Sequence, residues 1–378
     1  MIKVAVITTN RADYGLLQPL IENLDNDNEV DLQLFVTGSH LDDDYGKTIS
    51  EIIDDKAEIT ETIKIPSPDS DTISTNQSIS VALLEFEKTI IKHQPEWVVV
   101  LGDRFEMFAF ALSAFLAKKR IAHISGGEVT SGAIDDTFRH SISKMSELHF
   151  TSHEVYRKRV IQLGEQPANV FNVGALSTEN ISKFNDVNPF PDIDIPKDYK
   201  VAICTIHPVT NGEDANDILD ILFSELIKID NLFVVFTASN MDEGGDYLNT
   251  RIKDYCLNNV DKSVCYRSLG KDKYYSALKR IDFLIGNSSS GLTEAPLFSL
   301  PSINIGTRQN GRLFPPSVIQ CEISKDSFNE SVFKALENKK IESYRYGDGK
   351  TSNSIISVIK EFNKTAPKIK IFYDNISG

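Results

Sequence analysis

Residues 283–296 have the sequence FLIGNSSSGLTEAP, in which an apolar run leads through glycine and serine into a short helix-like segment. The run Phe283–Ile285 is typical of a buried strand, and Glu294 lies in the first turn of the segment that follows. Glycine allows a ligand to approach the backbone closely, and the N-terminus of a helix favours an anion. The stretch therefore predicts a strand-to-helix turn of an α/β domain that suits a nucleotide diphosphate. Serine caps of an ordinary turn would leave the same pattern, so that alternative stays open.

The same alternation of short apolar runs and longer amphipathic segments extends through the chain. We expect strands at Val4–Thr8, Leu32–Thr37, Trp97–Leu101, Ile121–Ile124, Leu148–Thr151, Val170–Val173, Lys200–Ile206, Leu232–Thr237, Ser263–Tyr266, Asp282–Ile285 and Ser302–Ile305. We expect helices at Leu16–Leu24, Ile79–Lys92, Phe105–Ala117, Phe138–Ser146, Glu154–Leu163, Asp214–Lys228, Tyr247–Leu257, Lys271–Lys279, Phe328–Leu336 and Ser354–Phe362. Continuous apolar strands separated by helices are typical of parallel sheets with both faces covered.

The alternation is interrupted once, by a stretch rich in Pro, Asp and Asn at residues 185–198. A chain of 378 residues is also longer than one simple core usually supports. We therefore predict an α/β protein of two doubly wound domains, at residues 1–174 and 175–351. The last segment, about 352–378, has no later strand to cover and is expected to return to the first domain. Ligands of such sheets bind beyond the carboxyl ends of the strands, so the expected site is the cleft between the domains.

Charge and composition exclude some classes of function. The formal net charge is −14, which disfavours a general nucleic-acid or membrane-surface binder, although a pocket can still be locally basic. No apolar run approaches the roughly 20 residues of a membrane span. The N-terminus leads directly into a strand without a signal peptide, so we expect a cytoplasmic protein. The four cysteines have no metal-ligand spacing, and we predict no metal site.

Polar side chains gather directly after the predicted strands of both halves. They include Arg11, Asp103, Arg104, Glu128, Asp135, Arg139, His207, Asn240 and Arg308. Each has a structural alternative. Asp103 fits a helix N-cap, Asp135 and Arg139 have the spacing of an intrahelical ion pair, and the other arginines suit surface salt bridges. Chance placement would not bring every such residue to a carboxyl strand end, so together they favour a ligand site.

Several well-known motifs are absent from the sequence. The first strand is not followed by GxGxxG, which disfavours a bound NAD, and there is no GxxxxGK[ST] for phosphoryl transfer. There is also no GxSxG elbow and no HExxH or HxH pair, which disfavours a hydrolase triad and zinc chemistry. The sequence therefore predicts no cofactor.

The ordered motifs resemble those of one known family, the hydrolysing UDP-N-acetylglucosamine 2-epimerases of sialic-acid biosynthesis. They are NRADYG (10–15), LGDRFE (101–106), HISGGE (123–128), IDDTFRH (134–140), HPVT (207–210), GNSSSG (286–291) and GTRQNGR (306–312). The resemblance extends in order from the first strand to about residue 312. No single motif is specific, but the ordered set is.

The resemblance implies two Rossmann-like domains in a GT-B-like arrangement, with a UDP-sugar in the interdomain cleft. It implies elimination of UDP from UDP-N-acetylglucosamine to give 2-acetamidoglucal, followed by addition of water to give N-acetylmannosamine. Carboxylates and a histidine suit these proton transfers, and arginines and backbone N–H groups suit the leaving diphosphate. It also implies a homodimer or homotetramer.

Matching the motifs residue by residue gives candidate roles. The catalytic candidates are Asp103, Glu128, Asp135 and His207. The substrate-binding candidates are Arg11, Arg104, Arg139, Asn240, Ser288, Ser289, Glu294 and Arg308. We expect Glu294 to accept hydrogen bonds from the ribose, and Ser288 and Ser289 to hold the diphosphate. Many relatives carry a glutamate where this chain has Ser125, and Glu128 is the nearest carboxylate that could take over its function.

Other functions stay open at this point. A related branch of the family acts on UDP-2,4-diacetamido-2,4,6-trideoxyglucose in legionaminic-acid synthesis. A glycosyltransferase of the same architecture would transfer the sugar to an acceptor, and a nucleotide-sugar sensor would bind without turnover. The sequence assigns neither the individual acid and base roles nor any allosteric control.

Overall fold

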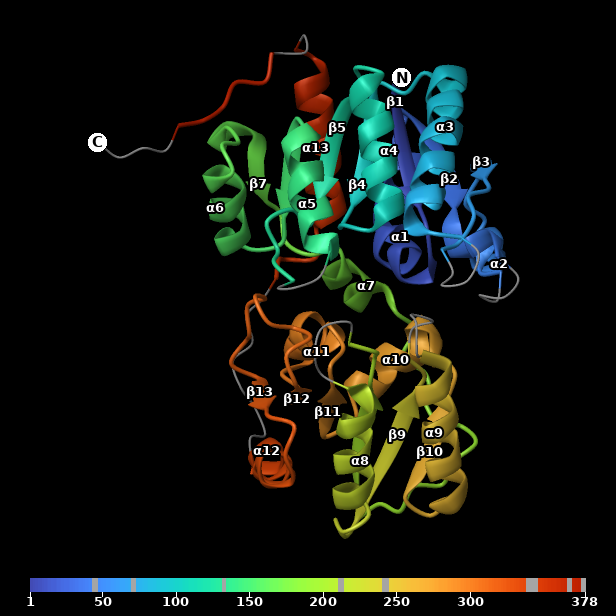
Figure 1. Cartoon of the computed structure of the whole chain (residues 1–378), viewed down its shortest axis with the longest axis vertical. Helices are drawn as coiled ribbons and strands as arrows, with labels where there is room; N and C mark the ends of the chain where they lie inside the picture. Colours follow the sequence, from blue (N-terminus) through green and yellow to red (C-terminus); the bar gives the residue numbers. More distant parts are fainter. Residues whose placement is uncertain are drawn as a thin grey trace. The chain divides into compact units, whose positions relative to one another are not determined.

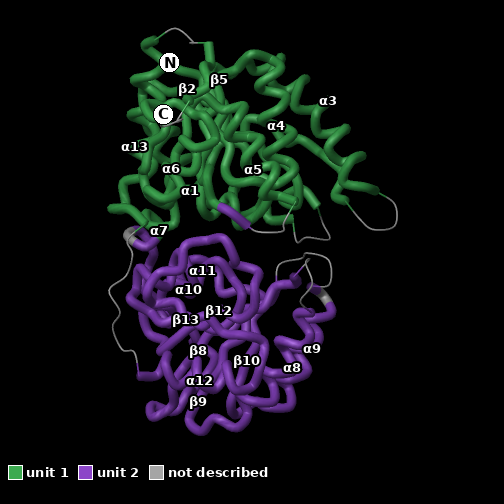
Figure 2. Tube along the Cα trace, turned by 60° about the vertical axis from the view of Figure 1, so that its left-hand side comes forward, with its two compact units in different colours: residues 1–128, 134–180, 346–378 green, residues 129–133, 181–345 purple. Residues whose placement is uncertain are grey.

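The computed structural model describes residues 1–42, 47–68, 73–130, 134–209, 214–239, 245–337, 346–365 and 369–374. The chain forms two compact units, which Figure 2 shows in different colours. Unit 1 comprises residues 1–128, 134–180 and 346–378, and unit 2 comprises residues 129–133 and 181–345. Each unit has its own parallel sheet covered by helices.

The sheet of unit 1 has the strand order β3-β2-β1-β4-β5-β6-β7 among the described residues, and all of its neighbouring strands pair in parallel. Its strands are β1 (Ile2–Thr8), β2 (Val30–Thr37), β3 (Ile59–Ile63), β4 (Trp97–Leu101), β5 (Arg120–Ile124), β6 (Leu148–Thr151) and β7 (Val170–Asn172). The direction of winding reverses between β1 and β4. Parallel sheets of this kind bind ligands beyond the carboxyl ends of the strands at such a reversal.

The helices of unit 1 cover both faces of its sheet (Figure 1). They are α1 (Arg11–Asp25), α2 (Ile49–Asp54), α3 (Thr75–His93), α4 (Phe105–Leu116), α5 (Ile134–Met145), α6 (Glu154–Gln162) and α13 (Thr351–Asn363), with short 3-10 turns η1 (Gly38–Leu41) and η2 (Pro167–Asn169). Helix α7 (Ser177–Lys183) contains the boundary between the two units, after residue 180. Helices α1 and α13 bury apolar side chains against one face. Helices α3, α4 and α5 do so against the other.

Helix α13 belongs to the core of unit 1, although it is separated from the rest of that unit by unit 2. It buries Ile355, Ile356 and Ile359 in the same cluster as α1. The indole nitrogen of Trp97, in β4, donates to the side-chain oxygen of Asn363 over 3.0 Å. These contacts attach the end of the chain to its first sheet.

Unit 2 contains a second parallel sheet, with the order β10-β9-β8-β11-β12-β13 in the described part of the chain. Its elements are β8 (Lys200–Thr205), α8 (Ala215–Leu226), β9 (Leu232–Thr237), α9 (Gly245–Asn258), β10 (Ser263–Tyr266), α10 (Gly270–Leu278), β11 (Phe283–Gly286), α11 (Ser290–Thr293), η3 (Ala295–Phe298), β12 (Ser302–Ile305), β13 (Val318–Cys321) and α12 (Lys325–Glu337). The winding reverses between β8 and β11, which makes their carboxyl ends the expected ligand edge.

The structure differs from the sequence prediction mainly at the ends and edges of elements. Helix α1 begins at Arg11 and not at Leu16, because the side chain of Asn10 caps it by accepting from the backbone N–H of Asp13 over 3.0 Å. Helix α5 begins at Ile134, one turn before the predicted start. The edge strands β3 and β13 and the short helices α2 and α7 were not predicted. No helix among the described residues has the length and apolar character needed to cross a membrane.

Candidate functional site

The carboxyl ends of β4 and β5 bring several predicted residues of unit 1 together. The two strands are neighbours in the sheet, so the turns after them meet at one edge. Gly102 has a φ of +76°, which glycine adopts without strain, and this turn carries Asp103. The turn after β5 leads to Glu128, and α5 starts at Ile134, one residue before Asp135. Three carboxyl groups therefore lie on neighbouring turns of one sheet.

Arg139 of α5 links two of these turns. Its side chain is only 3% exposed, and it donates to the carboxylate of Asp103 and, over 3.0 Å, to the carbonyl oxygen of Ser125. Glu128 lies 3.8 Å from the same guanidinium. Because a guanidinium offers several fixed donors, one arginine can orient both carboxylates. Its position favours support of the acids over direct contact with a substrate.

Asp135 has the protonation behaviour expected of a proton-transfer group. Burial raises the pKa of this carboxyl to about 6, and the nearby charge of Asp103 adds to the shift, while Arg104 and Arg139 oppose it. A carboxyl group with a pKa near neutral can both release and accept a proton at physiological pH. Asp135 is therefore suited to general acid–base chemistry.

Asp13 is a second acid of this kind, and the sequence prediction did not include it. Burial raises the pKa of Asp13 to about 6, although the charge of Arg104 and the hydrogen bond from Thr9 oppose the shift. The side-chain amide of Asn10 also donates to it over 2.9 Å. The available signal was the spacing of Asn10 and Asp13, an N-cap followed by an acid three residues later.

His123 in β5 is buried and connects the β4 turn to α5. Its Nε2 donates to the carbonyl oxygen of Gly102 over 2.8 Å, and its Nδ1 lies 3.0 Å from the hydroxyl of Ser143. Burial lowers the pKa of His123 to about 3, so the ring is neutral and Nδ1 acts as an acceptor. The histidine thereby holds the residue that precedes Asp103.

Two predicted substrate-binding arginines lie near this edge with part of their side chains in water. Arg11 forms an ion pair with Glu51 over 3.0 Å, and both side chains are more than 40% exposed. Arg104 donates to Glu106 through Nε and Nη2 over 3.2 and 3.1 Å. The exposed Arg11–Glu51 pair is weak, so an anionic ligand can compete for that guanidinium. Arg104 is 42% exposed, but its partner Glu106 is only 3% exposed.

In unit 2 a buried asparagine connects the ends of β8 and β11. Asn287 accepts from the backbone N–H of His207 over 2.8 Å and donates to the carbonyl oxygen of the same residue over 2.9 Å. Burial lowers the pKa of His207 to about 3, and the charge of Arg308 adds to the effect. His207 is therefore neutral near pH 7. Asn287 was quoted within a motif but not predicted as a site residue.

The loop after β12 contacts the same asparagine. Arg308 and Gln309 donate to the carbonyl oxygen of Asn287 over 3.2 and 2.7 Å. Three neighbouring strand ends of unit 2, those of β8, β11 and β12, are therefore joined through one residue. This arrangement places His207 and Arg308 at the same edge of the sheet.

The serine-rich turn that follows β11 is shorter than a typical phosphate-binding helix. Helix α11 has four residues and continues into the 3-10 turn η3. Ser288 and Ser289 precede α11, and the carboxylate of Glu294 accepts from the hydroxyl of Tyr275 over 2.7 Å. Any anion held here would therefore depend on the loop N–H groups and hydroxyls more than on a helix dipole.

A family model described as UDP-N-acetylglucosamine 2-epimerase matches residues 22–360 of the chain. The chain belongs to this family. The match covers the whole sheet of unit 2 and every strand of unit 1 except β1, so it also leaves out the turn after β1. The predicted family is thus confirmed. The family match alone does not identify the hydrolysing, sialic-acid subtype that the sequence also predicted.

Three relatives of this epimerase-family chain have informative names. A Campylobacter jejuni protein named GDP/UDP-N,N'-diacetylbacillosamine 2-epimerase (hydrolyzing) is 39% identical over 89% of this chain and 88% of its own. The Escherichia coli polysialic acid biosynthesis protein P7 is 35% identical over 99% and 98%. A Legionella pneumophila protein named UDP-N,N'-diacetylbacillosamine 2-epimerase (hydrolyzing) is 34% identical over 95% of each chain.

Solved structures confirm the predicted fold class of the epimerase-family chain. The S. aureus MnaA–UDP co-structure matches 98% of this chain and 100% of its own, with a TM-score of 0.78 and 18% sequence identity. At that identity the likeness supports the fold and not the substrate. The α/β class with two doubly wound domains agrees with the strand orders seen here.

The structure of this epimerase-family chain groups most of the predicted site residues into two sets. The first set lies in unit 1 and includes Arg11, Asp103, Arg104, Glu128, Asp135 and Arg139. The second lies in unit 2 and includes His207, Ser288, Ser289, Glu294 and Arg308. Asn240 lies outside the described residues. Within the described ranges, no group of three His, Cys, Asp or Glu side chains is placed to hold a metal ion.

Proposed function

We propose that this chain is a hydrolysing 2-epimerase of a UDP-2-acetamido sugar. The observation that carries the proposal is the grouping of Asp103, Glu128 and Asp135 around Arg139, together with the near-neutral pKa of Asp135, about 6. Proton removal and proton return both need carboxyl groups that change protonation state near working pH. A nucleotide-sugar sensor would have no use for such a cluster.

The proposed reaction needs no redox step. A base removes the proton at C2 of the sugar while the bond between C1 and the diphosphate oxygen breaks, which releases UDP and a 2-acetamidoglycal. Water then adds its hydroxyl to C1, and a proton returns to C2 from the opposite face. The C2 epimer leaves as a free sugar. We assign proton transfer to Asp103, Glu128, Asp135 and His207 as a set, without dividing the acid and base roles among them.

The nucleotide is assigned to unit 2. We propose that Ser288, Ser289 and Arg308 hold the diphosphate and that Glu294 accepts hydrogen bonds from the ribose. The proposal also includes Asn240 as a substrate contact, and Arg11 and Arg104 as cations for the departing pyrophosphate. The guanidinium of Arg308 supports this assignment, because it lies at the same edge of the sheet as His207.

The sugar favoured by the relatives is UDP-2,4-diacetamido-2,4,6-trideoxyglucose. Two relatives with 39% and 34% identity are named hydrolysing epimerases of diacetylbacillosamine. The second candidate is UDP-N-acetylglucosamine, which would give N-acetylmannosamine for sialic-acid synthesis. It is favoured by the 35% identical relative named for polysialic acid biosynthesis.

Proton NMR in D2O tests the reaction and the sugar together. The purified protein is incubated with each UDP-sugar separately, without cofactor or acceptor. We expect UDP and a free 2-epimer that carries deuterium at C2, formed faster from the diacetamido sugar. If UDP-N-acetylglucosamine is turned over faster, the second candidate is correct.

Two variants serve as controls in the same assay. Asp103→Asn should lower turnover by about a hundredfold or more, the usual contribution of a proton-transfer group. Glu128→Gln should also lose turnover, and near-normal activity would remove Glu128 from the catalytic set.

Release of UDP only after an acceptor is added would indicate a glycosyltransferase instead. Binding of both sugars with no product would indicate a sensor.

A further inference from the structure

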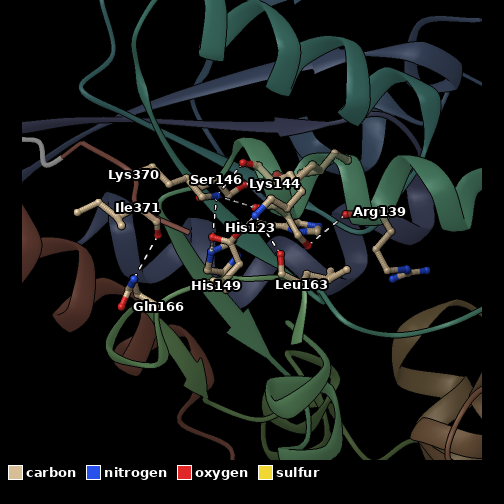
Figure 3. A network of polar contacts seen from close by, with 12 residues as sticks. His123, Arg139, Lys144, Ser146, His149, Leu163, Gln166, Lys370 and Ile371 are labelled. Atoms are coloured by element: carbon tan, nitrogen blue, oxygen red, sulfur yellow. Dashed lines mark hydrogen bonds and ion pairs between the residues drawn. The ribbon is translucent and has the colours of Figure 1, made fainter. Parts of the chain in front are cut away.

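Residues 369–374 form an extended segment on unit 1 that none of the functional assignments above uses. We call it the C-terminal strap. It lies beside the end of α5 and the turn that follows α6 (Figure 3). The backbone N–H of Tyr373 donates to the carbonyl oxygen of Gly164 over 2.8 Å. The side chain of Gln166 donates to the carbonyl oxygen of Ile371 over 3.2 Å.

The strongest attachment of the strap is the ammonium group of Lys370. It donates to the carbonyl oxygens of Ser143, Lys144 and Ser146 over 3.2, 2.7 and 2.7 Å, at the C-terminal end of α5. It also forms an ion pair with Glu165 over 2.7 Å. An ammonium has three N–H donors, so these four acceptors use its full capacity. A cation at this end of a helix also interacts favourably with the helix dipole.

Glu165 anchors the other side of this contact. Its side chain is buried and accepts from His149 over 3.0 Å and from Lys144 over 2.6 Å, in addition to Lys370. Although burial opposes ionisation, these hydrogen bonds hold the pKa of Glu165 at about 2. When Lys370 is removed, Glu165 keeps its contacts with Lys144 and His149, so its charge stays partly compensated.

Apolar burial contributes little to holding the strap in place. Ile369, Ile371 and Phe372 are 87%, 67% and 62% exposed. The ring of Phe372 does lie 5.0 Å from the ammonium of Lys144, a cation–π contact. The strap is therefore held mainly by polar contacts, and removing the ammonium of Lys370 should release it while the core of unit 1 stays intact.

The end of α5 is connected to the acid cluster by a short series of contacts. The carbonyl oxygen of Ser143 accepts from Lys370, and the hydroxyl of Ser143 lies 3.0 Å from Nδ1 of His123. Nε2 of His123 holds the carbonyl oxygen of Gly102, immediately before Asp103. The same helix carries Arg139, which donates to Asp103 from one turn earlier. The position of α5 thus determines two contacts that hold Asp103 in place, one through His123 and Gly102 and one through Arg139.

We propose that Lys370 is a positioning residue for the acid cluster of unit 1, and that it acts by fixing the C-terminal turn of α5. Its place in the reaction rests on the proposed function, since the cluster is catalytic only if that proposal holds. The effect of Lys370 is electrostatic, and no covalent bond forms or breaks at this residue. Lys370 contacts no substrate, and its effect passes through Ser143, His123 and Arg139.

The test compares Lys370→Met with Lys364→Met, a matched change at an exposed lysine that caps α13. For Lys370→Met we expect kcat to fall about tenfold to a hundredfold, as small misplacements of catalytic groups do. KM should stay within about a factor of two, because uniform substrate binding is not touched. Lys370→Arg keeps a cationic donor and should recover most of the activity. Lys364→Met should match the unsubstituted protein.

Hydrogen exchange gives a readout that does not depend on turnover. Amides in the last two turns of α5 should exchange about tenfold faster in Lys370→Met, while those of α4 stay unchanged. If the protein turns over neither UDP-sugar, the proposed function fails, and hydrogen exchange alone decides the role of Lys370. Unchanged protection in α5 would overturn the inference whatever happens to kcat.

A double substitution tests the route through Ser143. Ser143→Ala removes the hydroxyl contact with His123, so adding Lys370→Met should lower kcat by less than the product of the two single effects. Independent, multiplying effects would overturn this route. If Lys370→Met does not fold, Lys370→Gln provides the second measurement, because it removes the charge and keeps a hydrogen-bond donor for the carbonyl oxygens at the end of α5. It should lower kcat in the same direction by a smaller factor, and full activity would contradict the inference.

Discussion

Two carboxyl groups at the edge of the first sheet, those of Asp13 and Asp135, change protonation near neutral pH. Burial raises the pKa of each to about 6. A pKa that is higher in the folded chain than in the unfolded chain means that the native structure disfavours the ionised form. These two side chains therefore make unit 1 less stable as the pH rises from about 4 through about 6.

Replacement of Asp13 by asparagine tests this cost. Asp13→Asn removes the charge but keeps an acceptor for the hydroxyl of Thr9 and for the side-chain amide of Asn10. At pH 8 the ionised aspartate is destabilising, so the substitution should raise the free energy of unfolding by about 1–3 kcal/mol. At pH 4, below the folded pKa, the carboxyl is already protonated and the difference should disappear. Urea unfolding at both pH values measures the two free energies.

The control for this substitution is Asp25→Asn, at the exposed end of the same helix. It should change stability by a similar small amount at both pH values, because that side chain remains in water. A stabilisation of Asp13→Asn that is equal at pH 4 and pH 8 would show that the charge is not its cause.

For single residues, the sequence predicted which side chains lie at the edge of the sheet better than it predicted how buried they are and which groups they contact. Asp103 and Asp135 could be placed near the site because they follow apolar strands, and parallel strands end at a common edge. The burial of Asp13 and the bridging role of Asn287 depend on what surrounds them in three dimensions. Neither is visible in a local pattern, since an acid in a first turn and an asparagine after a strand are both ordinary turn residues.

Among the elements, the turn from β11 into α11 has the tightest geometry. Gly286 has a φ of +140°, and a Cβ added there would lie 1.9 Å from the carbonyl oxygen of Thr205 in β8. Because the contact is backbone to backbone, no side chain can move aside. Gly286→Ala should therefore separate β11 from β8 and lower the free energy of unfolding of unit 2 by about 3 kcal/mol or more.

Gly15 provides the matched control for this glycine. It lies inside α1, and a Cβ added there meets nothing within 4 Å. Alanine favours a helix over glycine, so Gly15→Ala should be neutral or stabilising by up to about 1 kcal/mol. Urea unfolding of both variants separates the effect of the turn from that of removing a glycine. Equal stabilities would show that β11 can shift without cost.

The sequence predicted elements well where they are buried on both sides. Central strands such as β4 have an apolar residue at every position, which makes them visible as continuous runs. The edge strands β3 and β13 have mostly half-buried or exposed positions, and their mixed composition resembles a loop. The order of the strands could not be predicted either, because it depends on how the helices between them pack.

For the molecule as a whole, the last helix is a structural part of the first unit. Ile355, Ile356 and Ile359 of α13 are buried in the core beneath the sheet. Burial of three such side chains stabilises a domain by roughly 5 kcal/mol or more, comparable with the whole stability of many domains. A chain that stops after residue 350 should therefore lack a stably folded unit 1. Circular dichroism and limited proteolysis would show whether it does.

The control for this truncation is a chain that stops after residue 365. It keeps α13 and omits residues 366–378, which include the C-terminal strap, so both units should remain folded. Resistance of residues 1–180 to proteolysis in the shorter chain would show that α13 is dispensable. That result would contradict the assignment of α13 to the core.

The return of α13 has a consequence for how the protein is made. The ribosome synthesises residues 1–180 and then all of residues 181–345 before the helix that completes the first core exists. At elongation rates of about 5–20 residues per second the delay is on the order of ten to thirty seconds. During that interval the nascent chain exposes the apolar surface around Trp97, which α13 later covers. The second unit can thus mature first, and the first sheet has to be kept from aggregating, by chaperones or by its own partial order, until translation is nearly finished.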